Sequence, residues 1–274
     1  MTLFLCFSAV SLLCVLPLCL TVWHLNIWVS LLITLGSYLL LHLVFVCCYG
    51  LVSLSIPKGK PLEKQNPLIC FGSAELASLL LFYGRVRPFL SGTERIPANG
   101  RFLFVCNHRS IFDPMIVMDK LRNYHIAFIS KPENMKIPVI GRCLQSIGYL
   151  SIDRENDRNA LKTILTAADY MKRDVCSIGI YPEGTRSKTE ELLPFHAGSL
   201  KAAQRAKVPI VVGCVRGTEN AQIVNIFSRR KDVYLDILEV IPAETVCSRR
   251  TEELSEHIRS VIRDGLDRAK AQEG

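Results

Sequence analysis

The chain has 274 residues, 49% of them hydrophobic, and a formal net charge of +8; this length allows one ordinary domain and an additional segment. No Asp, Glu, Lys or Arg precedes Lys58, so all the charge lies in the later part, whose basic balance suits anionic partners such as phospholipid surfaces. The eleven cysteines form no CxxC pair and no cluster at metal-ligand spacing, which argues against a metal site and against a secreted, disulfide-rich protein.

Two apolar runs, at residues 3–22 and 27–54, open the chain. Each reaches the ~20 residues that a helix needs to cross a hydrocarbon core about 30 Å thick. Trp23 and Trp28 flank the polar break between the runs, where interfacial aromatic residues are expected. A basic cluster follows, which the positive-inside rule places in the cytoplasm. Residues 1–56 are therefore predicted to form a membrane-anchoring helical hairpin with both ends in the cytoplasm. The cluster consists of Lys58, Lys60 and Lys64.

Other interpretations of this front end stay open. A cleaved signal peptide would need a basic first region and a small-residue cleavage site, and the first run shows neither clearly. The hairpin could instead be embedded in one leaflet without spanning the bilayer. A buried core of a soluble protein is disfavoured by so long a charge-free stretch. Attachment to a membrane is expected.

Residues 57–86 are predicted to form a basic linker and an interfacial segment. The apolar residues between positions 67 and 87 are too few for a membrane span, and Glu75 interrupts them. An amphipathic helix lying on the membrane would fit, with Arg85 and Arg87 toward the headgroups. A helix packed on the catalytic domain fits equally well.

From residue 87 to residue 274 short β-rich runs alternate with helical patterns, which predicts an α/β domain with a mixed sheet flanked by helices. This is the candidate catalytic domain. The strands are expected at 102–107, 124–130, 147–152, 175–181, 208–215 and 233–240, and the helices at 114–121, 138–145, 157–172, 197–206 and 250–269.

A histidine and an aspartate, His108 and Asp113, follow the first of these strands. A turn folded back on itself can place the carboxylate against the imidazole; their hydrogen bond would fix the tautomer and leave the other ring nitrogen as a base. Asp113 also precedes Pro114, a strong helix start, so it could serve purely as an N-cap. Ser110 is the alternative nucleophile, but no GxSxG elbow occurs in the chain.

A second string, Tyr181-Pro182-Glu183-Gly184-Thr185-Arg186-Ser187, follows the strand at 175–181. Gly184 lets backbone amides approach a ligand, and Thr185 can add a hydroxyl. Arg186 offers a bidentate fork for phosphate. The alternative without a ligand is a solvated turn with an exposed arginine.

The strings from His108 to Asp113 and from Glu183 to Ser187 resemble motifs I and III of the glycerolipid acyltransferases, specifically the 1-acylglycerol-3-phosphate acyltransferases. Residues 148–154 resemble motif II, with Ser151 where an aromatic is usual, and residues 208–212 resemble motif IV, with Val212 in place of a second proline. The four motifs occur in the family's order, and the resemblance covers about residues 85–245.

The resemblance implies a role for each motif residue. His108 would take the proton from an acceptor hydroxyl, which attacks an acyl thioester directly, and Asp113 would orient His108. The glycerol-phosphate headgroup would be bound by Glu183, Gly184, Thr185 and Arg186, with Arg154 as a second phosphate contact. Since a carboxylate repels phosphate, we expect Glu183 to hold Arg186 or a glycerol hydroxyl. For Arg154 a surface ion pair with a neighbouring aspartate is the alternative.

The expected protein is thus a membrane-anchored O-acyltransferase with its catalytic domain on the cytoplasmic side. It would transfer an acyl group from acyl-CoA or acyl-carrier protein to lysophosphatidic acid and form phosphatidic acid. No metal or redox cofactor and no nucleic-acid partner are expected, since HExxH, dinucleotide-binding and P-loop patterns are all absent. The alternatives are another lysophospholipid or acceptor, a membrane-bound lipase or thioesterase, and a lipid-binding protein with a dead site.

Overall fold

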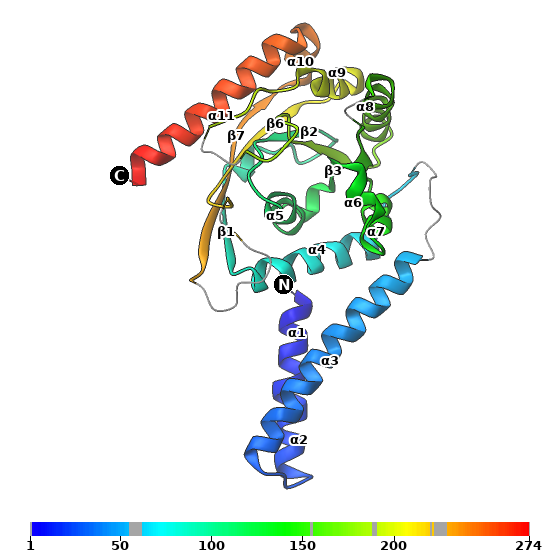
Figure 1. Cartoon of the computed structure of the whole chain (residues 1–274), viewed down its shortest axis with the longest axis vertical. Coiled ribbons are helices and arrows are strands. Elements are labelled where there is room, and N and C mark those ends of the chain that lie inside the picture. The colour runs from blue at the N-terminus through cyan, green and yellow to red at the C-terminus, as the bar shows by residue number, and fades with distance from the viewer. Residues whose placement is uncertain are drawn as a thin grey trace.

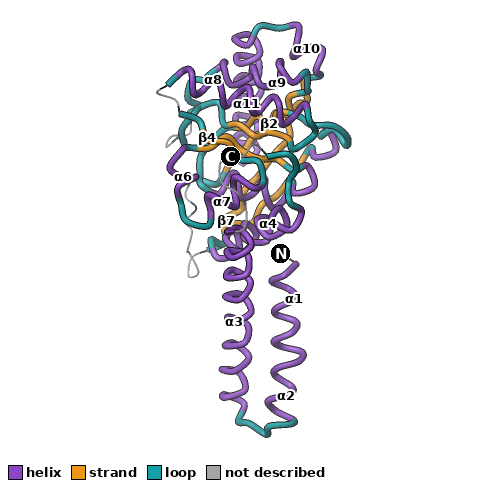
Figure 2. Tube along the Cα trace, turned by 90° about the vertical axis from the view of Figure 1, so that its right-hand side faces the viewer, coloured by secondary structure: helices purple, strands orange, loops and turns teal. Residues whose placement is uncertain are grey.

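A long helical hairpin leads into an α/β domain in a computed structural model of the chain (Figure 1). The structure describes residues 2–54, 62–153, 156–187, 191–219, 221 and 229–273. Both arms of the hairpin run side by side, with their turn at the end far from the domain (Figure 2). The predicted Lys58, Lys60 and Arg154 lie outside the described residues.

The first arm of the hairpin is not one regular helix. It comprises α1 (Thr2–Val10), a π-helical stretch η1 (Ser11–Val15) and α2 (Leu16–Thr21), and the second arm is α3 (Ile27–Leu54). The irregularity precedes Pro17, which has no N–H for the hydrogen bond of an α-helix. Leu3–Thr21 and Ile27–Leu54 are each long and apolar enough to cross a membrane, by length and composition.

Small polar side chains lie between the two arms. The Ser37 hydroxyl donates to the Ser11 hydroxyl at 3.2 Å, and Ser11, Ser30 and Thr34 are buried while many leucines point outward. Small residues that let helices approach, joined by hydroxyl hydrogen bonds, are typical of helix pairs in lipid.

Helix α4 (Pro67–Tyr83) joins the hairpin to the domain. Asn66 caps it by accepting the Leu68 and Ile69 amides, and Pro67 occupies its first turn. Its inner side packs against α5 (Phe112–Lys120), while the predicted contact of this segment with a membrane surface stays a prediction. Its outer side remains apolar, with Leu68 75% and Phe82 43% exposed.

A close approach fixes α3 against α4. A Cβ at Gly72 would lie 2.6 Å from the Tyr49 ring, so only glycine fits there, and the Tyr49 hydroxyl lies 2.6 Å from the Ser73 hydroxyl. The hairpin is thereby held to the helix that packs on the domain.

Within the described residues the sheet has seven strands, in the order β1-β7-β6-β2-β5-β3-β4. Neighbours are parallel except β6 and β7, which are antiparallel; the predicted mixed α/β sheet is confirmed. The edge strand β1 was not predicted, because Pro88 and alternating exposure weaken its pattern. The strands are β1 (Val86–Ser91), β2 (Leu103–Cys106), β3 (Ile126–Ser130), β4 (Leu150–Ser151), β5 (Ser177–Ile180), β6 (Ile210–Arg216) and β7 (Lys231–Ile241).

Helices cover both faces of the sheet, with α4 and α5 on one side and α8, α9 and α11 on the other (Figure 1). Helix α8 has the predicted bounds, whereas the predicted helix at 197–206 divides into η4 and α9. The remaining elements are η2 (Thr93–Arg95), η3 (Arg122–Tyr124), α6 (Pro132–Lys136), α7 (Ile140–Ser146), α8 (Asp157–Lys172), η4 (Ala197–Leu200), α9 (Lys201–Ala206), α10 (Ala243–Ser248) and α11 (Thr251–Glu273).

Candidate active site

The carboxyl ends of three adjacent parallel strands meet at one edge of the sheet. Strand β2 lies between β5 and β6 and is parallel to both. His108 follows β2, Glu183 follows β5 and Thr218 follows β6. The crevice at the carboxyl ends of parallel strands is where open α/β sheets bind ligands, so residues more than a hundred positions apart converge there.

The predicted His–Asp pair forms. Nδ1 of His108 lies 2.8 Å from Oδ2 of Asp113, and the histidine side chain is 20% exposed while that of the aspartate is 1% exposed. Because a carboxylate only accepts hydrogen bonds, Nδ1 carries the proton and Nε2 of the neutral ring is the basic nitrogen. Within the described residues no hydrogen bond occupies Nε2, which leaves it available to a substrate hydroxyl.

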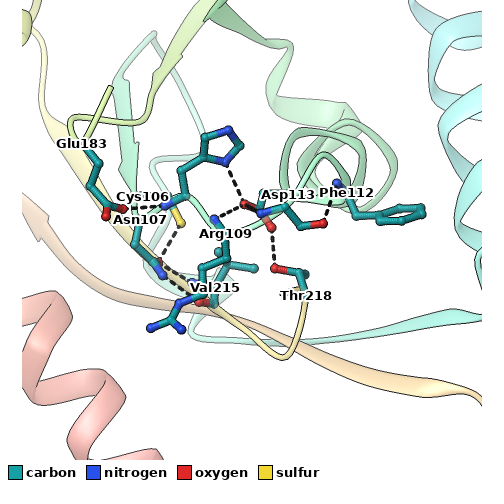
Figure 3. A network of polar contacts seen from close by, with 10 residues as sticks. Cys106, Asn107, Arg109, Phe112, Asp113, Glu183, Val215 and Thr218 are labelled. Atoms are coloured by element: carbon teal, nitrogen blue, oxygen red, sulfur yellow. Dashed lines mark hydrogen bonds and ion pairs between the residues drawn. The ribbon is translucent and has the colours of Figure 1, made fainter. Parts of the chain in front are cut away.

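The Asp113 carboxylate is held on both of its oxygens (Figure 3). Oδ2 also accepts the amides of Arg109 at 2.7 Å and Ser110 at 2.8 Å, and Oδ1 accepts the Thr218 hydroxyl at 2.7 Å. The N-cap alternative for Asp113 is wrong, because α5 begins at Phe112 and Asp113 lies inside its first turn. Its hydrogen bonds run back to the strand exit and fix the acid that orients His108.

Glu183 supports the backbone of the catalytic turn. It is only 3% exposed; Oε1 accepts the His108 amide at 2.7 Å and Oε2 accepts the Leu193 amide at 3.0 Å. Burial raises the pKa of Glu183, although these two amides act to lower it. The carboxylate does not pair with Arg186 within the described residues, because it points inward from its turn.

Two more contacts join the loops of the site. The Ser187 amide donates to the His108 carbonyl at 2.9 Å. The buried Asn107 side chain accepts from the Val215 amide and donates to the Val215 carbonyl, both at 2.8 Å (Figure 3). No role was predicted for Asn107, although it stands directly before His108.

The imidazole of His108 is also stacked on an aromatic ring. The centroids of the His108 and Tyr181 rings are 4.1 Å apart with planes 12° apart, and Tyr181 stacks in turn on Phe128 at 4.9 Å. Burial raises the pKa of Tyr181 well above its ordinary value, so the phenol is a neutral wall of the site. This role of Tyr181 was not predicted, although an aromatic residue directly before Pro182-Glu183 could have indicated it.

Gly184 lies in the turn of the predicted anion site. Its φ of +74° lies in the left-handed region that favours glycine, and its amide donates to the Tyr181 carbonyl at 3.0 Å. Thr185 and Arg186 are exposed. In the part of the chain that the structure describes, Arg186 has neither a hydrogen bond nor an ion pair, and Ser187 beside it is bonded to His108. Arg154 is not among the described residues.

A groove of about 590 Å³ borders Tyr181 and Gly184. Its wall is mainly aliphatic and comes from β3, β5 and α8, while polar side chains from η4 and its surroundings line another part. A mostly apolar groove with a few polar groups is the usual form of a small-molecule site. The aliphatic residues include Ile129, Ile152, Ala160, Leu161, Ile164 and Ile180, and the polar ones include His196, Ser199 and Lys201.

Comparison with known proteins gives a consistent picture. Residues 87–215 match the family model described as Acyltransferase. The chain is 32% identical over 189 residues to a 1-acyl-sn-glycerol-3-phosphate acyltransferase of Salmonella typhimurium, covering 66% of this chain and 75% of that protein. It is 32% identical over 166 residues to the protein of the same name in Escherichia coli, covering 60% of this chain and 66% of that protein.

A solved structure shares the fold. The crystal structure of the 1-acyl-sn-glycerophosphate (LPA) acyltransferase PlsC from Thermotoga maritima has a TM-score of 0.60 to this chain. The two share 22% sequence identity, and the similarity covers 83% of this chain and 89% of that one. The fold match therefore includes most of both chains.

Proposed function

The chain belongs to the 1-acyl-sn-glycerol-3-phosphate acyltransferases, a family of O-acyltransferases, and we propose that it acylates the free hydroxyl of 1-acylglycerol-3-phosphate to form phosphatidic acid, with acyl-CoA or acyl-carrier protein as donor. The observation that carries this proposal is the His108–Asp113 pair, with Nδ1 bonded to the buried carboxylate and Nε2 left for a substrate. That arrangement suits proton removal from a hydroxyl.

In the proposed reaction Nε2 of His108 takes the proton of the acceptor hydroxyl while the oxygen of that hydroxyl attacks the thioester carbonyl. Asp113 holds the ring and stabilises the imidazolium that forms. The new ester C–O bond forms as the C–S bond breaks, and His108 returns the proton to the leaving thiolate. No covalent acyl-enzyme is needed. The Ser110 hydroxyl oxygen accepts from the Phe112 amide at 3.4 Å, which does not activate it as a nucleophile.

The acceptor phosphate is proposed to bind at the exposed turn of Gly184, Thr185 and Arg186. An arginine with no partner in the described part of the chain can receive a phosphate without first losing an ion pair. Arg154 stays a proposed second contact. Glu183 enters this proposal as the residue that positions the His108 backbone rather than as a contact of the substrate.

The aliphatic groove beside Tyr181 is proposed to hold an acyl chain of a substrate, since it borders the ring that stacks on His108. The hairpin would keep the site at a lipid surface, where acceptor and product both reside. The catalytic domain is proposed to face the cytoplasm, because both ends of the hairpin adjoin it (Figure 2) and Lys64 follows on the same side.

The test is a lipid assay on the purified full-length protein with labelled oleoyl-CoA, with and without lysophosphatidic acid. Phosphatidic acid is expected only with the acceptor, and the His108→Ala variant should lose it while keeping its melting temperature. His257→Gln, which alters a histidine paired with Glu239, is the matched control and should stay active. Free fatty acid in place of phosphatidic acid would establish a hydrolase, and acylation of a different lysophospholipid would replace the proposed acceptor.

A further inference from the structure

A second cavity, of about 450 Å³, lies where the hairpin meets the catalytic domain. Its walls come from the first turn of α1, the end of α4, the start of β1, the end of α5 and the residue before β7. It shares no lining residue with the groove beside Tyr181. Its lining includes Phe4, Leu81, Phe82 and Pro88 on the apolar side and Arg85, Arg87, Lys120 and Arg230 on the basic side.

Positive charge is in excess in this cavity: among the described residues, its lining includes four basic side chains and one carboxylate, that of Asp119. The carboxylate is already engaged: its Oδ1 accepts from Arg122 at 2.7 Å and from the Ser78 hydroxyl, and its Oδ2 lies 3.1 Å from Lys120. Arg87 is neutralised outside the cavity by Asp232, 2.6 Å away. The charge of Arg230, which is exposed, adds to that of the other cations of the wall.

The cavity lies at the level where a membrane surface would meet the domain. Phe4 stands in the first turn of α1, and its ring packs on Phe82 with centroids 4.4 Å apart. The Leu3 amide donates to Glu75 of α4 at 3.0 Å. This is the end of the hairpin that adjoins the domain (Figure 1), so headgroups of a bilayer around the hairpin would reach the cavity.

We propose that this cavity binds the phosphate headgroup of an anionic membrane phospholipid, as a lipid site separate from the catalytic one. Basic pockets at the end of membrane helices suit such headgroups, and the apolar wall of Phe4 and Phe82 suits the adjoining acyl chains. A free phosphate ion has no apolar part that could contact this wall. Asp113 and Lys120 lie seven residues apart along α5, about 10 Å at a rise of 1.5 Å per residue. The site is therefore at the opposite end of α5 from the catalytic pair.

The experiment is native mass spectrometry of the full-length protein in detergent, titrated with phosphatidylglycerol or phosphatidylcholine. Phosphatidylglycerol is anionic and is neither the proposed acceptor nor the proposed product. Wild-type protein should retain it in preference to phosphatidylcholine, and Arg230→Gln and Lys120→Gln should each weaken it about fivefold, as expected for one basic residue at a lipid surface. The matched control is Arg229→Gln, which removes an equal charge from an exposed neighbour that does not line the cavity.

Three results would overturn the proposal. An equal loss in Arg229→Gln would show attraction by the general surface charge only. Equal retention of phosphatidylcholine would show that no headgroup is selected. Displacement of phosphatidylglycerol by excess inorganic phosphate would assign the cavity to a soluble ligand. His108→Ala should bind phosphatidylglycerol as the wild type does, so this proposal and the proposed reaction can fail separately.

Discussion

The ring of Tyr181 lies flat against the imidazole of His108, with centroids 4.1 Å apart and planes 12° apart. Asp113 holds the same imidazole by its edge, at Nδ1. The histidine is thus fixed both in its tautomer and in the plane of its ring; one contact comes from the first turn of α5 and the other from the residue after β5.

Substitutions of Tyr181 should distinguish the contribution of its ring to activity from that of its hydroxyl. The hydroxyl has no hydrogen-bond partner within the described residues, so Tyr181→Phe should leave kcat within about twofold of wild type. Tyr181→Leu removes a stacking contact of the kind that contributes about 0.5–1.5 kcal/mol and should lower kcat about three- to tenfold. Steady-state kinetics on both variants, with melting temperatures as the folding control, makes the comparison. A phenylalanine variant as impaired as the leucine variant would assign a role to the hydroxyl instead.

Loss of the Asp113 charge should reduce activity more than loss of the hydrogen bond from Thr218 to its carboxylate. Asp113→Asn should lower kcat by about 10²–10⁴, since an amide can leave the histidine in the wrong tautomer. Thr218→Val removes only the hydroxyl bond to Oδ1, a contribution of about 1 kcal/mol, and should lower kcat about fivefold. Single-turnover rates at saturating acceptor measure both. A threonine variant as inactive as the asparagine variant would contradict this order.

Glu183→Gln should reduce stability as well as rate. Both carboxylate oxygens accept backbone amides, and a glutamine leaves one buried donor facing its amide group, at about 1–3 kcal/mol. The melting temperature and kcat should fall together, with little change in the KM for the acceptor. A variant of normal stability with a raised acceptor KM would return Glu183 to the role of a substrate contact.

Arg186→Ala should give the opposite pattern. Its side chain is exposed, so the melting temperature should stay the same, while the acceptor KM should rise about tenfold for the loss of one charge-assisted phosphate contact. Kinetics against lysophosphatidic acid at fixed donor concentration tests this. The donor KM is the internal control, and a selective rise in it would move Arg186 from the acceptor to the donor.

Acid should weaken the junction between α4 and α5. Burial acts to raise the pKa of Glu75 and of Asp119, but Arg122 and further hydrogen bonds outweigh it, so both pKa values are lowered in the folded protein. The unfolded chain then binds more protons, and the stability these groups contribute is present above their ordinary values of 4.5 and 3.8 and is lost as pH falls below them.

Melting temperatures measured from neutral pH down to about pH 2, below both ordinary pKa values, would show this loss. Arg122→Gln should lower the melting temperature at neutral pH and flatten its dependence on pH. Arg250→Gln, which breaks an exposed 3.8 Å pair with Glu252, should change neither. An unaltered acid profile in Arg122→Gln would mean that other groups control acid stability.

Local patterns in the sequence were sufficient to predict much of the fold and part of the candidate site. Apolar residues at helical spacing in α8, among them Ile164, Ala168 and Met171, and the Asn156 cap define a helix without help from the rest of the chain. The His108–Asp113 bond joins residues five positions apart. The backbone contacts of Glu183 could not be predicted in this way, because the direction of its carboxylate depends on how the β5 turn lies over the β2 turn. Thr218 reaches Asp113 from 105 positions away, and no feature of the sequence around it marks that contact.

The position of β6 has a consequence for how the protein is made. A chain is synthesised from its N-terminus, so the hairpin at residues 2–54 emerges long before Val215 and Thr218, which complete the hydrogen bonds of Asn107 and Asp113. Domains fold as their segments become available during synthesis. The catalytic centre therefore assembles on a nascent chain whose apolar hairpin has already left the ribosome, and a chain that stops before β6 would carry the hairpin without a finished site.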